Sequence, residues 1–487
     1  MVSLHDDTPS PAVPSPSSQP SPSILTRGEL AAAGYVAKSV KAEIRDNLLV
    51  AMAAGQDRFP GIIGFADTVL PQLERALLAG HDMVLLGERG QGKTRLIRTL
   101  VGLLDEWTPV VVGCEINDHP FEPVCTRCQR LAAEHGDALP IEWKHRSSRY
   151  GEKLATPDTS VGDLIGDVDP IKVAEGRRLG DPETVHYGLV PRTNRGIFSL
   201  NELPDLAERI QVSLLNVLEE RDIQVRGYAL RLPLDLLLVA SANPEDYTNR
   251  GRIITPLKDR FGAEIRTHYP LRLEDELLLI RQEAALGWGE NAVSAEVPDH
   301  LLEVLARFTR LVRESPAVDT RSGVSARFAV SSAETVAASA VRRAVLTGEE
   351  SAVARVSDLP AVVPVARGKV EFEASEEGRE VEVLAHLLRR ATAETFRSRL
   401  GGFDLSAVQA KFEGEATVET GELVPAAELL RRVGPVPGLA KLLERLGIDG
   451  ADSPGLAASG LEFALEGLHL SRRLSKDELP GRTVYGG

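Results

Sequence analysis

Short apolar runs alternate with helical patterns through the first half of the chain. The runs that have the length of a buried strand lie at 82–87, 108–113, 196–200 and 234–242. Helical patterns at about 66–79 and from Lys93 onward separate these runs. Strands that are apolar on both faces and alternate with helices are typical of a parallel sheet with helices packed on both sides. The pattern therefore predicts an α/β fold built on a parallel sheet.

The second half of the chain is predicted to be mainly helical. Amphipathic helices are expected at 273–286, 298–313 and 331–347, and further helices at 381–397 and 423–474. The segment "GKVEFEASEEGREVEV" at 368–383 alternates like a small hairpin. Near the amino terminus, residues 27–54 have a helical pattern that Gly55 closes.

These patterns and the composition divide the chain into segments. Residues 1–24 are rich in Pro and Ser and offer little to bury, which predicts a disordered tail. The other segments are a helical segment at 25–60, an α/β core at 61–270 with a cysteine-containing insertion at 114–150, a helical domain at 271–348, a hairpin-and-helix connector at 349–400 and a C-terminal helical region at 401–487.

Composition limits the class of protein and its partners. The chain has 487 residues, and 43% of them are hydrophobic, which is enough for several buried cores. A formal net charge of -15 argues against nucleic acid as a partner. The amino terminus lacks the basic and apolar regions of a secretory signal, and no apolar run has the length of a membrane span. We therefore expect a cytoplasmic protein.

The stretch "GERGQGKT" at 87–94 fits the phosphate-loop pattern G-x-x-x-x-G-K-[ST]. A predicted strand precedes it and an apolar helix follows it, which is the context that the motif requires. The glycines let backbone N–H groups face the phosphates, Lys93 reaches the β- and γ-phosphate oxygens, and Thr94 ligates Mg²⁺. The predicted nucleotide-binding residues are Gly87, Glu88, Arg89, Gly90, Gln91, Gly92, Lys93 and Thr94.

The stretch "SLNELPDL" at 199–206 ends an apolar run and places Glu202 at the carboxyl end of a predicted strand. In phosphate-loop enzymes a second strand end holds the metal and positions a water, so Glu202 is the candidate base. Asn201 stands where an aspartate is expected. It keeps an acceptor oxygen for Mg²⁺ but lacks the charge, so we expect weaker Mg²⁺ affinity with the base retained. The alternative is a purely structural strand in a chain that binds nucleotide without hydrolysing it.

Two further segments offer polar groups for the same chemistry. The strand predicted at 234–242 is followed by Asn243, which is a candidate to hold the attacking water. In "LKDRF", Arg260 is the candidate to stabilise charge on the γ-phosphate of a neighbouring subunit. Arg250 and Arg252 are weaker candidates for that role.

All three cysteines of the chain lie close together in the insertion. Cys125 and Cys128 have the C-x-x-C spacing of two tetrahedral Zn²⁺ ligands, and Cys114 is a candidate third ligand. His119 or His135 could supply the fourth. The alternative is a metal-free insertion with reduced, buried thiols, because a second C-x-x-C pair is missing.

Together these segments resemble the AAA+ ATPases, within the group of the magnesium chelatase I subunit and the MoxR-type ATPases. The resemblance covers about residues 60–345. It rests on "GERGQGKT", "TSVGDLIGDVDPIKVAEG" at 159–176, "YGLVPRTNRGIFSLNELPDL" at 187–206, "ASANPED" at 240–246 and "LKDRFG" at 257–262. Asn201 departs from the Asp-Glu pair of that family.

The resemblance implies a fold and an assembly. It implies a hexameric ring with ATP at each interface, an AAA+ core, and a helical lid at 271–348. It implies that Arg260 acts on the neighbouring subunit's nucleotide, and that Arg327 in "SGVSARFAV" senses nucleotide from the lid. Ile62 and Ile63 are expected to contact adenine.

The resemblance also implies a chaperone-like motor that works with a partner bearing a von Willebrand factor A domain. The output would be remodelling of that protein or metal insertion, such as Mg²⁺ into a porphyrin. A nucleotide-gated scaffold with little or no hydrolysis is the alternative, because of Asn201. A sigma-54-type transcription activator ranks third, since "ELPDLAERIQVSLLNVLEER" is similar to such proteins but no "GAFTGA" loop is present.

Overall fold

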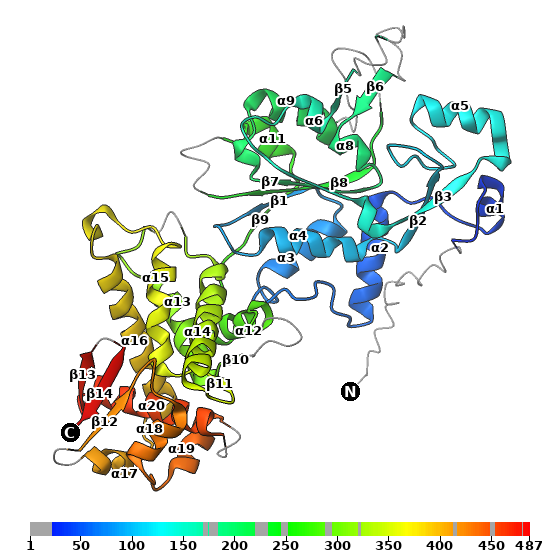
Figure 1. Cartoon of the computed structure of the whole chain (residues 1–487). Helices are drawn as coiled ribbons and strands as arrows, with labels where there is room; N and C mark the ends of the chain where they lie inside the picture. Colours follow the sequence, from blue (N-terminus) through cyan, green and yellow to red (C-terminus); the bar gives the residue numbers. More distant parts are fainter. Residues whose placement is uncertain are drawn as a thin grey trace, which may run out of the picture. The chain divides into compact units, whose positions relative to one another are not determined.

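The computed structural model describes residues 22–168, 174, 184–219, 232–244, 252–287, 295–319, 323–412, 416–448, 453–479 and 481–487. The chain forms two compact units (Figure 1), the first of Met1–Glu88 with Gly92–His268 and the second of Arg89–Gln91 with Tyr269–Gly487. The predicted tail at 1–24 lies outside the described residues except at its end.

The first unit is built on the predicted parallel sheet. Its strands are β1 (Met83–Leu86), β4 (Tyr150–Leu154), β7 (Gly196–Asn201), β8 (Leu236–Ala242) and β9 (Ala263–Arg266). They are all parallel, in the order β4-β7-β8-β1-β9. The prediction of an α/β fold is therefore confirmed.

Alternate residues of the strands face two separate hydrophobic clusters. On one face Met83 and Leu85 pack with residues of α2 (Val40–Ala53), α3 (Val69–Leu78) and α4 (Lys93–Thr99). On the other face Val84 and Leu86 pack with residues of α8 (Leu189–Arg192), α9 (Glu208–Glu219) and α11 (Thr255–Arg260). Figure 1 shows these helices on opposite sides of the sheet. Burial on both faces explains why the central strands are mostly apolar.

One predicted strand does not belong to this sheet. The run at 108–113 forms β2 (Trp107–Val111), which pairs antiparallel with β3 (Ile141–His145) in a separate two-stranded sheet. The same insertion carries α5 (Thr126–His135). An apolar run indicates that a strand is buried, but it does not identify the strand's partner, and so the assignment to the parallel sheet was wrong.

A buried ion pair joins helix α2 to Arg149, near the C-terminal end of the insertion. Residues 27–54 form two helices, α1 (Arg27–Ala32) and α2, where the pattern predicted one helical stretch. Glu43 of α2 accepts two hydrogen bonds from Arg149, at 2.7 and 2.8 Å, and both side chains are buried. The pair satisfies charges that would otherwise be costly to bury.

The other elements of the first unit are short. They are α6 (Val161–Leu164), β5 (Gly166–Val168), β6 (Val185–Tyr187), η1 (Leu100–Leu103), η2 (Gly136–Ala138), η3 (Arg146–Arg149) and η5 (Leu203–Asp205), where η denotes a 3-10 helix.

The second unit is mainly helical. Its longer helices are α12 (Leu273–Glu283), α13 (Asp299–Arg313), α14 (Ala326–Thr347), α16 (Glu380–Leu400) and α20 (Pro454–Leu470). Its shorter elements are β10 (Ala295–Glu296), β11 (Ala352–Val353), η6 (Val356–Ala361), α15 (Val362–Arg367), η7 (Ala374–Glu376), α17 (Ser406–Gln409), η8 (Ala410–Phe412), β12 (Thr417–Thr420), α18 (Ala426–Val433), α19 (Leu439–Leu446), β13 (Ser475–Leu479) and β14 (Arg482–Gly486).

Buried side chains from the predicted lid and from the C-terminal region form one hydrophobic core. Helix α20 is buried on all sides from Gly455 to Leu468, as expected of a helix that is mostly apolar around its circumference. His300 of α13 lies in this core, 4.8 Å from the ring of Phe463 between ring centres and 3.3 Å from Ser459 Oγ. The two segments thus stabilise each other.

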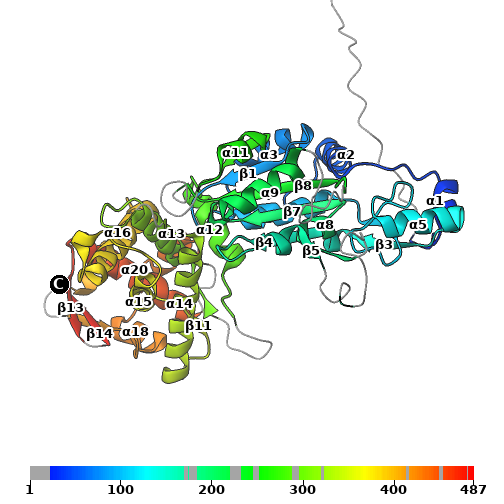
Figure 2. The same ribbon diagram turned by 90° about the horizontal axis from the view of Figure 1, so that it is seen from above.

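Two details of the second unit differ from the prediction. The expected hairpin at 368–383 is absent from the described structure, because α16 begins at Glu380, directly after a turn at Gly378 with φ of 84°. Acidic residues in the first turn of α16 favour the helix. The region at 401–487 also contains a three-stranded antiparallel sheet in the order β12-β14-β13, and the C-terminus lies at this sheet (Figure 2).

Among the helices that the structure describes, none combines the length and the apolar character required to cross a membrane.

Candidate functional site

The predicted phosphate loop lies between the carboxyl end of β1 and the start of α4. Gly90 and Gly92 have φ of 72° and 78°, values that glycine adopts without the steric cost paid by other residues. Gly87 N donates to Ala242 O at 3.1 Å, which joins the start of the loop to the end of β8. The glycines therefore stand where the backbone curls.

Lys93 is the buried cation of this loop. Its Nζ donates to the backbone oxygens of Gly87 and Glu88, the latter at 2.8 Å. It also donates to Asn243 Oδ1 at 2.9 Å. Only 7% of Lys93 is exposed, so water screens its charge little. The oxygen acceptors named above stabilise the buried ammonium group.

Asn243 connects Lys93 to the candidate base. Its Oδ1 faces Lys93, and its Nδ2 donates to Glu202 Oε2 at 2.8 Å. The ends of β7 and β8, which are neighbouring parallel strands, bring Glu202 and Asn243 together. Three residues predicted from separate motifs thus form one hydrogen-bonded chain.

Glu202 has an unusual backbone conformation. Its φ of 55° and ψ of 48° are left-handed, a region that residues other than glycine seldom adopt. Its N–H donates to Ser241 Oγ at 3.4 Å. Such a conformation costs of order 1–3 kcal/mol and is concentrated at functional sites. Here the turn takes Glu202 out of the alternating pattern of β7.

Asn201 is buried beside a carboxylate that the sequence did not suggest. Its Nδ2 donates to Glu152 Oε1 at 2.7 Å, and its Oδ1 accepts from Ser241 Oγ at 3.2 Å. Glu152 lies on β4, next to β7 in the sheet. A negative charge therefore lies directly against the amide that replaces the expected aspartate.

Glu152 is held in its ionised form by hydrogen-bond donors. It accepts from Arg98 Nε at 3.0 Å, from Arg98 Nη2 at 3.1 Å and from the Tyr150 hydroxyl at 3.0 Å. Burial raises the pKa of Glu152, but the hydrogen bonds from Arg98, Tyr150 and Asn201 outweigh it and keep the pKa below its usual range.

The other predicted residues occupy varied positions. Ile62 and Ile63 are half-buried, and Ile62 packs against the core cluster of α2 and α3. Thr94 and Glu88 are half-buried, Gln91 is buried, and Arg89 is exposed. Arg260 ends α11 and donates from Nη1 to Pro256 O at 2.8 Å. Arg252 and Arg327 are exposed, Arg327 as the first turn of α14 in the second unit, and Arg250 lies outside the described residues.

Two subunits of magnesium chelatase are similar in sequence to part of this chain. The magnesium-chelatase subunit ChlI of Anabaena variabilis is 30% identical over 189 residues, which cover 38% of this chain and 52% of that subunit. The magnesium-chelatase 38 kDa subunit of Cereibacter sphaeroides is 28% identical over 240 residues, covering 47% of this chain and 63% of that subunit. These similarities relate the chain, at a distance, to the AAA+ ATPases of the magnesium-chelatase group.

Further similarities are partial. The family model described as the sigma-54 interaction domain matches residues 179–260 of this chain. A structure of the complex between BchI and BchD of magnesium chelatase has 21% identity and a TM-score of 0.34, covering 67% of this chain and 98% of that one. A RuvB mutant of Thermotoga maritima has 14% identity and a TM-score of 0.36, covering 87% and 93%. The chain spans about half the length of the ChlI subunit, so the activity and partners of that subunit do not transfer to it directly.

The chain carries a second cluster of reactive side chains in its insertion. The ligand atoms of Cys114, Asp118, Cys125 and Cys128 all lie within 4.8 Å of one another, and all four residues are buried. We predicted His119 or His135 as the fourth ligand, whereas in the described cluster Asp118 is the residue grouped with the thiols. His135 is exposed at the end of α5.

His119 contacts other groups, although its Nε2 is buried without a hydrogen-bond partner among the described residues. Its Nδ1 accepts from Phe121 N at 3.0 Å, and its ring stacks on Tyr35 with centres 5.9 Å apart. Burial, together with the charge of Arg195, lowers the pKa of His119 to about 3. The ring is therefore a neutral member of an aromatic cluster.

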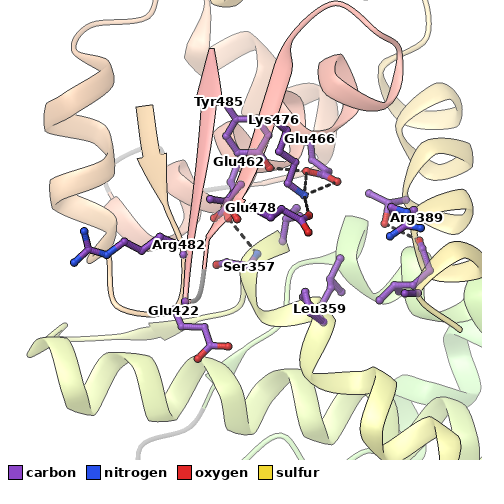
Figure 3. Close-up of a pocket in the computed structure, with 18 of the residues that line it drawn as sticks. Ser357, Leu359, Arg389, Glu422, Glu462, Glu466, Lys476, Glu478, Arg482 and Tyr485 are labelled. Atoms are coloured by element: carbon purple, nitrogen blue, oxygen red, sulfur yellow. Dashed lines mark hydrogen bonds and ion pairs between the residues drawn. The ribbon is translucent and has the colours of Figure 1, made fainter. Parts of the chain in front are cut away.

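A cavity of about 320 Å³ lies in the second unit, among η6, α16, α20, β13 and β14. Figure 3 shows Lys476 between two carboxylates, with Nζ 3.0 Å from Glu466 and 2.9 Å from Glu478. The Tyr485 hydroxyl donates to Glu466 at 2.5 Å. These charges pair with one another at the cavity wall and stabilise the fold.

Proposed function

We propose that this chain binds ATP with Mg²⁺ and hydrolyses it as one subunit of an oligomeric ring. The observation that carries the proposal is the hydrogen-bonded chain from Lys93 through Asn243 to Glu202 beside the glycine loop. A cation for phosphate oxygens, a positioning amide and a carboxylate base are the groups that phosphoryl transfer to water requires.

The residues of the site fit these ligands. The loop at 87–94 would seat the phosphates, with the charge of Lys93 against their oxygens, because its glycines supply the left-handed turns that a close backbone approach needs. Thr94 and Asn201 would hold Mg²⁺, which when bound neutralises phosphate charge. We assign adenine contact to Ile62 and Ile63.

Hydrolysis in this proposal depends on the pair at the strand ends. Glu202 accepts the proton of the attacking water, and Asn243 fixes the direction of its carboxylate through the 2.8 Å hydrogen bond. Arg260 of a neighbouring subunit would stabilise the developing charge, and Arg327 would sense the nucleotide from the lid. Such positioned charges act on the transition state more than on the bound substrate.

Glu152 favours hydrolysis over the alternative of a nucleotide-gated scaffold. The scaffold hypothesis rests on the charge that Asn201 lacks. Glu152 Oε1 on the neighbouring strand lies 2.7 Å from the Asn201 amide, so a carboxylate, itself paired with Arg98, lies beside the position that lacks one. The site therefore contains two carboxylates, Glu152 and Glu202, which come from two neighbouring strands. In the family pattern the two carboxylates are consecutive residues, an aspartate and a glutamate.

ATP turnover by wild type and Glu202→Gln tests the proposal. We expect a loss of about 10²–10⁴-fold in turnover for Glu202→Gln, with ATP binding retained. Glu142→Gln is the matched control, since the Glu142 side chain on β3 is 41% exposed and its Oε1 lies 3.9 Å from Lys144 Nζ. Equal, near-zero rates in wild type and Glu202→Gln, with ATP binding in both, would support the scaffold instead.

The assembly and the client are proposals that rest on the family resemblance. We propose a cytoplasmic homo-oligomer, with a hexameric ring as the expected size, that remodels a partner bearing a von Willebrand factor A domain. Magnesium insertion into a porphyrin is the second candidate, because the named relatives are magnesium-chelatase subunits. Affinity capture on the full-length protein with ATP distinguishes them by the partner recovered, a porphyrin-binding subunit favouring the second.

A further inference from the structure

We propose that Cys114, Asp118, Cys125 and Cys128 bind a structural Zn²⁺ ion that fastens the insertion to the AAA+ core. The site goes beyond the proposed ATPase function and does not depend on nucleotide chemistry. All of the chain's cysteines take part in it.

The distances suit a tetrahedral ion. The four ligand atoms lie within 4.8 Å of one another. In a tetrahedron with Zn–S bonds of about 2.3 Å, the sulfur atoms are about 3.8 Å apart. The cluster therefore needs only a small contraction to complete the coordination shell, without a change of fold.

An unpartnered carboxylate oxygen points to a cation. Asp118 Oδ2 accepts from Cys125 N at 2.9 Å, whereas Asp118 Oδ1 is buried and has no hydrogen-bond partner among the described residues. Asp118 is fully buried, and an unsatisfied buried carboxylate oxygen is costly. A metal ion at the centre of the cluster removes that cost.

The sulfur atoms are arranged as metal ligands rather than as disulfide partners. Asp118 N donates to Cys114 Sγ at 3.4 Å, and Cys128 N donates to Cys125 Sγ at 3.3 Å. Hydrogen bonds of this kind stabilise the thiolate form that binds metal. All three cysteines are free. Soft thiolates with one carboxylate in a tetrahedral set favour Zn²⁺ over harder cations.

The local backbone explains how a short sequence assembles the site. Gly113 and Asn117 have φ of 65° and 55°, so the chain turns sharply after β2 and brings Cys114 and Asp118 to the same side. Cys125 is the N-cap of α5, and Cys128 lies in its first turn. The C-x-x-C spacing therefore presents both thiols to the loop that follows β2.

The same loop is attached to the core of the first unit. Asn117 Nδ2 donates to Arg192 O at 2.9 Å, and Asn194 Nδ2 donates to Ile116 O at 3.0 Å. Residues 192 and 194 directly precede β7, whose far end carries Glu202. By fixing the loop at 114–118, the ion would hold the insertion on the segment that leads into the candidate catalytic strand.

Metal analysis of the full-length protein, purified without chelator, tests the proposal. We expect stoichiometric zinc in wild type. After removal of zinc under reducing conditions, Co²⁺ should bind and give the visible absorption and thiolate charge-transfer bands of a tetrahedral sulfur-rich site. This measurement needs no variant, so it stands even if a cysteine variant fails to fold.

Two variants identify the fourth ligand. Asp118→Ala should reduce zinc retention by at least about 10-fold against a competing chelator, in line with loss of a ligand. His119→Asn is the matched control and should retain zinc like wild type. The proposal is overturned by protein that neither contains zinc nor takes up Zn²⁺ or Co²⁺, or by stoichiometric iron with inorganic sulfide. Loss of zinc in His119→Asn but not in Asp118→Ala would overturn the assignment of Asp118.

Discussion

The contact between Asn201 and Glu152 predicts a cost for restoring the aspartate of the family pattern. Asn201→Asp replaces the Nδ2 donor, 2.7 Å from Glu152 Oε1, with a carboxylate oxygen. Two unit charges at about that distance repel by roughly 6 kcal/mol gross at an effective dielectric near 20. Loss of a hydrogen bond to a charged acceptor adds about 1.5–3 kcal/mol.

Part of this repulsion is relieved in the protein. Arg98 lies 3.0 Å from Glu152, and 23% of the Glu152 side chain is exposed, so solvent and the guanidinium both screen the added charge. We therefore expect a net loss of about 2–4 kcal/mol in the free energy of unfolding. For a unit of this size, that loss lowers Tm by roughly 5–10 °C.

Thermal unfolding in EDTA measures the cost. Mg²⁺ with ATP should then raise the Tm of Asn201→Asp more than that of wild type, because a bound cation neutralises the added carboxylate. The double variant Asn201→Asp/Glu152→Gln should recover most of the loss, since a glutamine amide can donate to the new aspartate. The reasoning is refuted if Asn201→Asp is as stable as wild type in EDTA, or if the double variant is no more stable than Asn201→Asp.

Two further predictions concern buried charged or titratable groups. Glu43→Leu leaves the Arg149 guanidinium buried without its carboxylate, so urea unfolding should show a loss of about 3–5 kcal/mol, and Glu43→Leu/Arg149→Met should lose less. An equal or larger loss in the double variant would contradict this account. Burial, with the charge of Arg399, lowers the pKa of His300 from 6.5 to about 3, so the unfolded chain binds a proton that the folded chain does not. The stability contributed by neutral His300 is complete above pH 6.5 and is lost as the pH falls toward 3, by about 2 kcal/mol between pH 6.5 and 5. Urea unfolding at the two pH values should show a shallower acid loss in His300→Gln, and identical losses would exclude His300 as the cause.

The central strands were predictable from sequence and the edge strands were not. β1, β7 and β8 are covered on both faces, so most of their residues are apolar. β4 and β9 lie at the two edges of the sheet, where half-exposed positions admit the charged residues of "YGEKL" and "AEIR". Hydrophobic periodicity carries little information about such strands.

The same distinction applies to the candidate site. Motif spacing predicted Lys93, Glu202 and Asn243, because a short loop or a strand end fixes each side chain locally. Glu152 was missed because its strand was missed and its contact with Asn201 arises between strands. Spacing alone also did not suggest Asp118, whose place beside the thiols depends on how the chain folds after β2.

The left-handed backbone of Glu202 lowers the stability of the fold at a position where the side chain is the candidate base. A glycine would adopt its φ of 55° with no steric penalty, whereas any other side chain carries a cost of about 1–2 kcal/mol throughout the life of the folded protein. Selection for stability alone would thus favour glycine there, so the carboxylate is kept at a cost to the fold. The residue at position 202 is for this reason a useful marker in related proteins. A carboxylate there would indicate that hydrolysis is retained, and a glycine would indicate that only the fold is retained.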